Sequence, residues 1–121
     1  MTAFRSIRDI APLELAPGLA ARAFAGERMT VAVVDLEPNA VAPEHHHENE
    51  QIGFVISGSL KFKVGEEERD LRAGDTYTIA SNVTHRGVAG PDGATVCDVF
   101  VPIRAEWAQL KPKEPTRPNW P

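Results

Sequence analysis

The chain has 121 residues, a formal net charge of −4 at pH 7 and a sequence pI near 5.5. This length fits one domain, because a chain of this size buries one hydrophobic core but not two. The acidic balance, with no cluster of Lys and Arg, argues against a nucleic-acid surface or a binder of anionic membranes. A small molecule is therefore the expected partner.

The sequence shows neither a secretion signal nor a membrane span. Its N-terminal segment has no apolar core of signal-peptide length, and no stretch approaches the roughly 20 apolar residues that a span needs. The single cysteine, Cys97, lies in an apolar run and is expected to be a buried structural thiol, which is compatible with reducing surroundings. We therefore expect a cytoplasmic protein.

Hydrophobic periodicity indicates strands over most of the chain. Short alternating or apolar segments are separated by Gly, Pro and Asn, and helical spacing is almost absent until the end. This pattern predicts an all-β sandwich or barrel. The expected strands, in chain order, cover residues 4–7, 20–24, 29–36, 41–45, 51–57, 59–64, 67–71, 75–79, 84–88 and 94–101.

Two glycine-containing pairs mark turns between these strands. Ser57-Gly58 and Gly65-Glu66 are each expected to close a tight hairpin, because glycine tolerates the positive φ that such turns require. Between the two turns, apolar residues alternate with lysines. Only one face of that hairpin is therefore expected to be buried.

The composition changes after residue 102. Residues 104–110 contain good helix formers and are expected to form a short helix. Residues 111–121 contain four prolines, which favour an extended arm or disorder. We therefore expect one β-domain over residues 1–110 and a Pro-rich arm over residues 111–121.

The residues with metal-binding chemistry concentrate in the segment PEHHHENEQ, residues 43–51. Alternate residues of a strand point to one face, so His45 and His47 can reach one point while His46 is turned away. Gln51 adds its amide oxygen to the same side if the chain re-enters that face after a local irregularity. This spacing indicates a metal site.

A fourth ligand has to come from elsewhere, and His85 is the remaining histidine. The alternative interpretation is a His-rich loop that is merely solvated. Glu48 or Glu50 can also replace Gln51 as a ligand, although Glu50 has the wrong parity for the face that the two histidines share.

Two motifs in this order resemble those of the cupins, a family of metal-binding β-barrels. The pattern P-x-H-x-H-x-x-x-Q over residues 43–51, followed by Ser57-Gly58, resembles the first cupin motif, and Gly74-Asp75 with His85 resembles the second. The resemblance implies a double-stranded β-helix, or jelly-roll barrel, and one divalent transition metal. The ligands that it implies are His45, His47, Gln51 and His85.

The chain departs from the usual cupin pattern at two positions. Most cupins have Glu where this chain has Gln51, and Ala80 replaces the usual Pro of the second motif. A neutral amide leaves the charge of the metal uncompensated, which favours Lewis-acid work over oxygen chemistry. Three imidazoles and an amide accept Zn, Ni, Mn, Fe or Cu, so the identity of the metal stays open.

A further stretch, D-V-F-V-P-x-R over residues 98–104, resembles the ending of the KdgF family of pectin-degradation enzymes. That family opens or tautomerises unsaturated uronates, so the resemblance implies the isomerisation or ketonisation of such an acid. Asp98 would move the proton and Arg104 would hold the substrate carboxylate. A structural carboxylate and a surface charge are the alternatives for these two residues. Phe100 and Tyr77 are candidate substrate contacts, with a role in the core as the alternative for each.

Two other functions stay open at this point. One is an Fe or Mn cupin dioxygenase, which an anaerobic assay distinguishes from an isomerase. The other is a non-catalytic cupin that binds a small molecule, for which binding without turnover is the sign.

The segment over residues 51–57 also predicts an assembly. One face of this strand carries Gly53 and Val55, and the other carries Ile52, Phe54 and Ile56. A lone small barrel is expected to leave one face of its sheet wet, so the outer apolar face requires a cover. The candidates for this cover are a second copy of the chain and the N-terminal strand, and our hypothesis is a homodimer.

Overall fold

A computed structural model describes residues 2–113 and residue 120 of the chain. Most of the Pro-rich arm predicted over residues 111–121 lies outside the described residues. Within them, no helix is long and apolar enough to cross a membrane. The elements are η1 (Ile7–Asp9), β1 (Leu13–Ala16), β2 (Leu19–Ala25), β3 (Thr30–Leu36), β4 (Val41–His45), β5 (Glu50–Val64), β6 (Glu67–Arg72), β7 (Thr76–Ile79), β8 (His85–Val101) and η2 (Ala105–Gln109).

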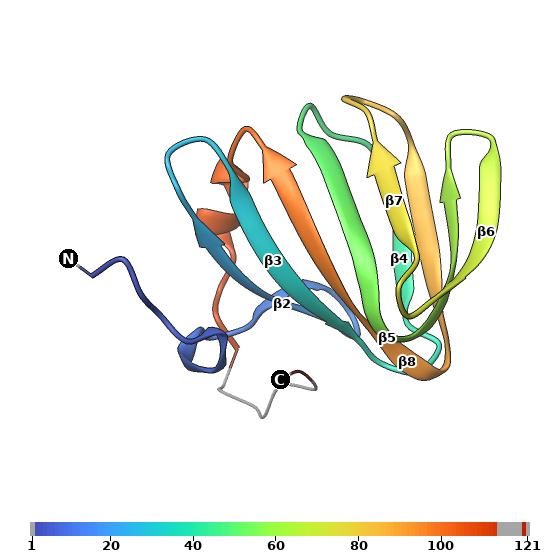
Figure 1. The fold of residues 1–121 in the computed structure, drawn as a ribbon, viewed down its shortest axis with the longest axis horizontal. Coiled ribbons are helices and arrows are strands. Elements are labelled where there is room, and N and C mark those ends of the chain that lie inside the picture. Colours follow the sequence, from blue (N-terminus) through green and yellow to red (C-terminus); the bar gives the residue numbers. More distant parts are fainter. Residues whose placement is uncertain (1, 114–119, 121) are drawn as a thin grey trace.

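The strands form one antiparallel sheet that curls into a barrel-like fold, as the sequence pattern predicted. The strand order is β1-β2-β3-β8-β5-β6, with β4 paired to β8 and β7 paired to β5. Figure 1 shows β2 and β3 toward one end of the sheet and β6 at the other. The two long strands β5 and β8 run between these ends and pair with each other over most of their length. The short helix expected near the C-terminus is the 3-10 helix η2.

The hairpin predicted at Ser57-Gly58 is wrong, because β5 continues through this pair without a turn. Gly58 has a φ of 77°, and a Cβ at this position would clash with the carbonyl oxygen of Gly93 on β8. The register between β5 and β8 shifts on both sides of Gly58. The glycine therefore bends a continuous strand where it crosses its neighbour. The second turn, at Gly65-Glu66, is the expected hairpin between β5 and β6.

Two further strand predictions are wrong for reasons of pairing. Residues 85–88 and 94–101 belong to one strand, β8, because β5 pairs with both parts of it, while β4 pairs with the first part and β3 with the second. Residues 4–7 form no strand and lead into η1. The N-terminal strand is instead β1, which pairs with β2 and whose Leu13 forms a bridge to Pro112.

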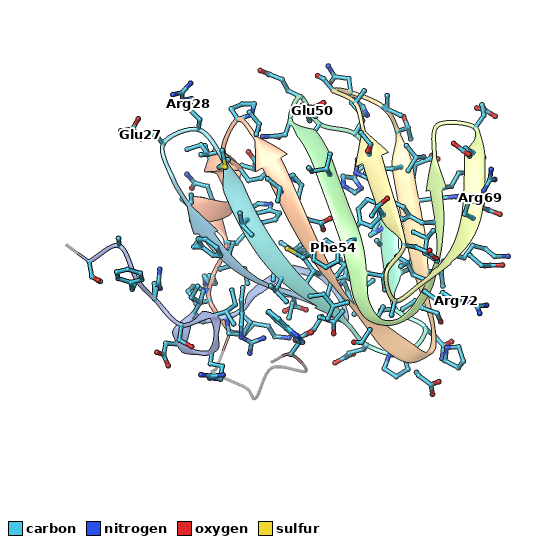
Figure 2. All side chains as sticks on the ribbon, viewed as in Figure 1. Glu27, Arg28, Glu50, Phe54, Arg69 and Arg72 are labelled. Atoms are coloured by element: carbon cyan, nitrogen blue, oxygen red, sulfur yellow. The ribbon has the colours of Figure 1, made fainter. Side chains whose placement is uncertain are left out.

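The two faces of the sheet differ in environment. The inner face holds the core, which includes the fully enclosed Ala21, Ala32 and Val55. On the outer face, Ile52 and Phe54 of β5 are 49% and 45% exposed, and Figure 2 marks Phe54 near the middle of that strand. The predicted presence of apolar residues on both faces of this strand is confirmed.

Candidate metal centre and cavity

Three histidines meet where β4 ends and β8 begins. His45 is the last residue of β4 and pairs directly with His85, the first residue of β8, while His47 lies in the loop after β4. The ring centroids of His45 and His85 are 4.2 Å apart, and those of His47 and His85 are 4.9 Å apart. One nitrogen from each ring lies within 4.8 Å of the others. His46 is exposed and lies outside this group, as strand alternation predicted.

Backbone carbonyls fix the tautomer of all three rings. In each histidine, Nδ1 donates to a carbonyl oxygen two residues away, which leaves the lone pair on Nε2. The three distances are 2.7 Å from His45 to Pro43, 3.0 Å from His47 to Asn49 and 2.9 Å from His85 to Val83.

Burial favours the neutral form of His47 and His85, in which a ring nitrogen can act as a ligand. It lowers the pKa of His85 to about 4, and burial followed by the charge of Arg104 lowers the pKa of His47. His85 is 3% exposed, and its Nε2 atom is buried without a hydrogen-bond partner among the described residues. A buried nitrogen of this kind is costly unless it binds something. The three Nε2 atoms therefore fit a divalent metal ion.

Gln51 joins this group from β5. Its side chain is buried, and its Oε1 lies 3.0 Å from Nε2 of His47. The amide also forms a hydrogen bond with Asp98, and an amide that donates to a carboxylate turns its oxygen toward the histidines. Two acceptors then face each other, an arrangement that a cation between them stabilises. Glu48 and Glu50, the alternative ligands, are exposed and lie outside the histidine cluster.

The histidine cluster borders a cavity of about 430 Å³ on the inner face of the sheet. The cavity is mostly apolar at its far side, where residues of β1, β2 and β3 line it. The polar and aromatic residues singled out from the sequence converge on its other side. These lining residues are His45, Gln51, Tyr77, Asp98, Phe100 and Arg104.

Asp98 and Tyr77 contact each other across a glycine of the strand between them. Gly53 of β5 pairs with Tyr77 of β7 on one side and with Asp98 of β8 on the other. The Tyr77 hydroxyl donates to Oδ1 of Asp98 at 2.6 Å, and a Cβ at position 53 would clash with both residues. The strand pattern predicted only that Gly53 and Val55 share a face and indicated no role for Gly53, because its two neighbours are distant in sequence.

Burial decides the ionisation of this pair. It raises the pKa of Asp98 to about 6, although the hydrogen bonds from Tyr77 and Gln51 and the charge of Arg104 act in the opposite direction. Burial and the adjacent carboxylate also raise the pKa of Tyr77, so that its hydroxyl stays a donor. Asp98 is thus a buried carboxyl that can gain or lose a proton near neutral pH.

Arg104 lies at the side of the cavity against two aromatic rings. Its guanidinium carbon is 4.8 Å from the ring centroid of Phe100 and 4.7 Å from that of Trp107, within cation–π range. Its Nε donates to the carboxylate of Glu106. No sequence pattern singles out Glu106, which has ordinary surface-helix character.

Asn49 is another residue with a structural role that no sequence pattern indicates. It is 7% exposed, and its amide nitrogen donates to the carbonyl oxygens of Pro102 at 2.6 Å and Ile103 at 3.2 Å. The backbone N–H of Arg104 donates in turn to Oγ1 of Thr30 at 3.0 Å. These bonds tie the segment before Arg104 to the loop that carries His47.

Comparison with known proteins agrees with this architecture. Residues 32–100, more than half of the chain, match a family described as Cupin domain. The chain belongs to the cupin family. This cupin is 30% identical over 80 residues to the pectin degradation protein KdgF of Dickeya dadantii (strain 3937), a match that covers 65% of this chain and 73% of that protein.

Solved structures of small cupins also match this chain. The structure of KdgF from Halomonas sp. matches this cupin with a TM-score of 0.80 at 26% identity, and the match covers 88% of this chain and 98% of that one. An RmlC-like cupin from Shewanella frigidimarina NCIMB 400 matches with a TM-score of 0.81 at 21% identity over 88% of this chain and 96% of that one, which shows the fold alone. The protein is a small cupin that resembles KdgF and has a histidine cluster compatible with a divalent metal.

Proposed function

We propose that this cupin is a metal-dependent isomerase that converts an unsaturated uronate into its linear keto form. The observation that carries this proposal is the convergence of a buried carboxyl, Asp98, and a positioned guanidinium, Arg104, on the cavity that the histidine cluster borders. The pectin degradation protein and the KdgF structure among its relatives support a sugar acid as the substrate class.

In this proposal, one divalent ion is held by His45, His47, Gln51 and His85. Zn, Ni, Mn, Fe and Cu all suit such ligands. When bound, the metal supplies Lewis acidity toward oxygen atoms of the substrate. The neutral Nε2 atoms and the orientation of Gln51 by Asp98 support this ligand set.

Asp98 is proposed to move the proton. Ring opening breaks the bond between the anomeric carbon and the ring oxygen: the anomeric hydroxyl loses its proton and becomes an aldehyde, and the ring oxygen gains a proton and becomes an enol. Ketonisation then moves the enol proton to the other carbon of the double bond. Both steps are isomerisations, so neither an oxidant nor a second substrate is consumed. A carboxyl with a pKa near neutrality can give and take this proton, and the Tyr77 hydroxyl keeps it in one orientation.

Arg104 is proposed to hold the carboxylate of the uronate. A planar guanidinium suits two-point contact with a carboxylate, and its position over two aromatic rings fixes its direction. Phe100 and Tyr77 would contact the sugar ring from the cavity wall, since both line it.

The test is an assay of metal-loaded protein on the unsaturated monomer released by a pectin lyase, followed by loss of the ultraviolet absorbance of its conjugated double bond. Turnover that continues without oxygen is the expected result. A rate equal to the uncatalysed one contradicts the proposal. Binding without turnover would indicate a sugar-acid-binding cupin, and a requirement for oxygen would indicate a dioxygenase.

We also propose that two copies associate through the outer face of the sheet. Phe24, Ile52 and Phe54 on this face are between 45% and 49% exposed, and a second cavity of about 730 Å³ lies between this face and the N-terminal segment. Monomeric proteins rarely leave a contiguous apolar patch of this kind in water. Light scattering at micromolar concentration should give a dimer, and a monomer would contradict the assembly.

A cytoplasmic location stays a prediction from the sequence.

A further inference from the structure

We propose that Glu106 is an internal competitor for the substrate: its carboxylate occupies Arg104 in the ligand-free protein, and an acidic ligand has to displace it. Glu106 then sets the affinity of the cavity for acids without taking part in the reaction. This inference rests on the proposed function, because it assumes that Arg104 receives the carboxylate of the substrate.

The first observation is that the carboxylate of Glu106 and the carboxylate of the substrate would use the same partner, Arg104. The Nε of Arg104 already donates to Oε1 of Glu106, and the two residues form an ion pair. Both residues line the cavity of about 430 Å³. A uronate in this cavity therefore meets an arginine that is already paired.

The second observation is that the arginine is fixed. Its side chain is 12% exposed and packs against the rings of Phe100 and Trp107, which are themselves 3% and 9% exposed. The hydrogen bonds from Asn49 to the preceding carbonyls and from the Arg104 N–H to Thr30 hold its backbone. A positioned guanidinium loses little freedom on binding, so it favours a rigid two-point contact.

The third observation is that the glutamate is free to leave. Its side chain is 58% exposed, so its carboxylate can return to water at little cost in solvation. Burial, the largest single influence, acts to raise the pKa of Glu106, but the hydrogen bonds to its carboxylate and the charges of Arg104 and His47 together lower that pKa. The residue is therefore an anion at neutral pH, as the incoming acid is.

These observations make the exchange selective for acids. Replacing one carboxylate on Arg104 by another leaves the charge of the site unchanged, and the buried guanidinium is never without a partner. A neutral sugar has no group that compensates Arg104 for the loss of Glu106. Glu106 therefore opposes the binding of acids by competition and leaves neutral ligands in the rest of the cavity unaffected.

The experiment compares a charged and a neutral sugar on the metal-loaded, full-length protein by isothermal titration calorimetry. The probes are galacturonate, which has no double bond to isomerise, and galactose. Glu106→Gln should bind galacturonate about two- to five-fold more tightly than wild type, the range expected when a half-exposed ion pair is removed. Its binding of galactose should not change. In the uronate assay, the same variant should lower KM by a similar factor and leave kcat unchanged.

Two variants control for charge in general. Glu67→Gln removes a carboxylate from a more exposed Arg–Glu ion pair, the 2.9 Å contact with Arg69, on β6 where Figure 2 marks that arginine. Glu67 does not line the cavity, so this variant should bind both sugars as wild type does. Glu106→Asp keeps the charge but shortens its reach, and its affinity for galacturonate should lie between those of wild type and Glu106→Gln.

Each contrary outcome has a distinct meaning. Unchanged or weaker galacturonate binding by Glu106→Gln, with wild-type metal content and melting temperature, overturns the inference. The proposed function survives that result if wild type turns over the unsaturated uronate. Equal tightening by Glu67→Gln also overturns the inference, because the effect would then be one of net charge. If wild type and Glu106→Gln both fail to bind galacturonate and to turn over the uronate, the inference fails together with the proposed function.

Discussion

Whether a histidine of this cupin can bind a metal depends on the hydrogen bond that its other ring nitrogen makes. His45, His47 and His85 each direct Nδ1 to a backbone carbonyl, so each presents Nε2 to the cluster. His46 has the same side chain but is exposed, just after the end of β4, and lies outside the cluster. A histidine-rich segment is therefore a metal site only where the backbone fixes the rings.

Asp98→Asn tests the proton transfer. The amide keeps the shape of the carboxyl and can still accept the hydrogen bond from Tyr77, but it cannot act as a general acid or base. The rate on an unsaturated uronate should fall by about 10²- to 10⁴-fold, with metal content and melting temperature unchanged. If Asp98 is only structural, the melting temperature should fall and activity should follow the folded fraction. A folded, metal-loaded and fully active variant would exclude this carboxylate from the chemistry.

Gln51→Glu tests the neutral ligand. An anionic oxygen should keep or raise the affinity for the metal, while it lowers the Lewis acidity and hence the isomerase rate. The ionised side chain also loses the hydrogen bond that Gln51 makes to Asp98. Metal titration and turnover on one preparation measure both effects. Glu50→Gln, at the exposed neighbouring position, is the control and should change neither; loss of metal in that variant would contradict Gln51 as the ligand.

At the scale of elements, the centre of β5 decides which side chains meet. Tyr77 on β7 and Asp98 on β8 lie two strands apart, and they touch because the residue between them is Gly53. Any side chain at this position on the inner face would separate them. β5 therefore both lines the cavity and, through Gly53, allows Tyr77 and Asp98 to form their hydrogen bond.

Gly53→Ala should separate this pair. The added Cβ clashes with Asp98 and Tyr77, so we expect a loss of about 1–3 kcal/mol in the free energy of unfolding, as for other overpacked sites, and a large loss of turnover. Gly26→Ala is the matched control, because a Cβ there meets no atom within 4 Å. Thermal melting and the uronate assay measure both variants. Wild-type stability and turnover in Gly53→Ala would show that the contact between Tyr77 and Asp98 is not needed.

At the scale of the whole molecule, the features set by strand alternation could be predicted from the sequence, and those set by pairing between distant segments could not. The all-β fold and the approach of His45 and His47 result from the two-residue period of a strand. The continuity of β5 through Gly58 depends on Gly93, which is far away in the chain. Arg104 and Glu106 are close in sequence, but the position of their ion pair at the cavity depends on how η2 lies against the sheet.

The measurement that tests the account most directly is the metal content of protein purified without an affinity tag. Wild type should carry about one first-row divalent ion per chain, and His85→Ala should lose most of it because His85 is the most buried histidine of the cluster. His46→Ala, which removes an exposed histidine outside the cluster, should retain the ion. Wild-type protein that holds no metal as purified, and takes up none on reconstitution, would contradict the metal centre and the function proposed from it.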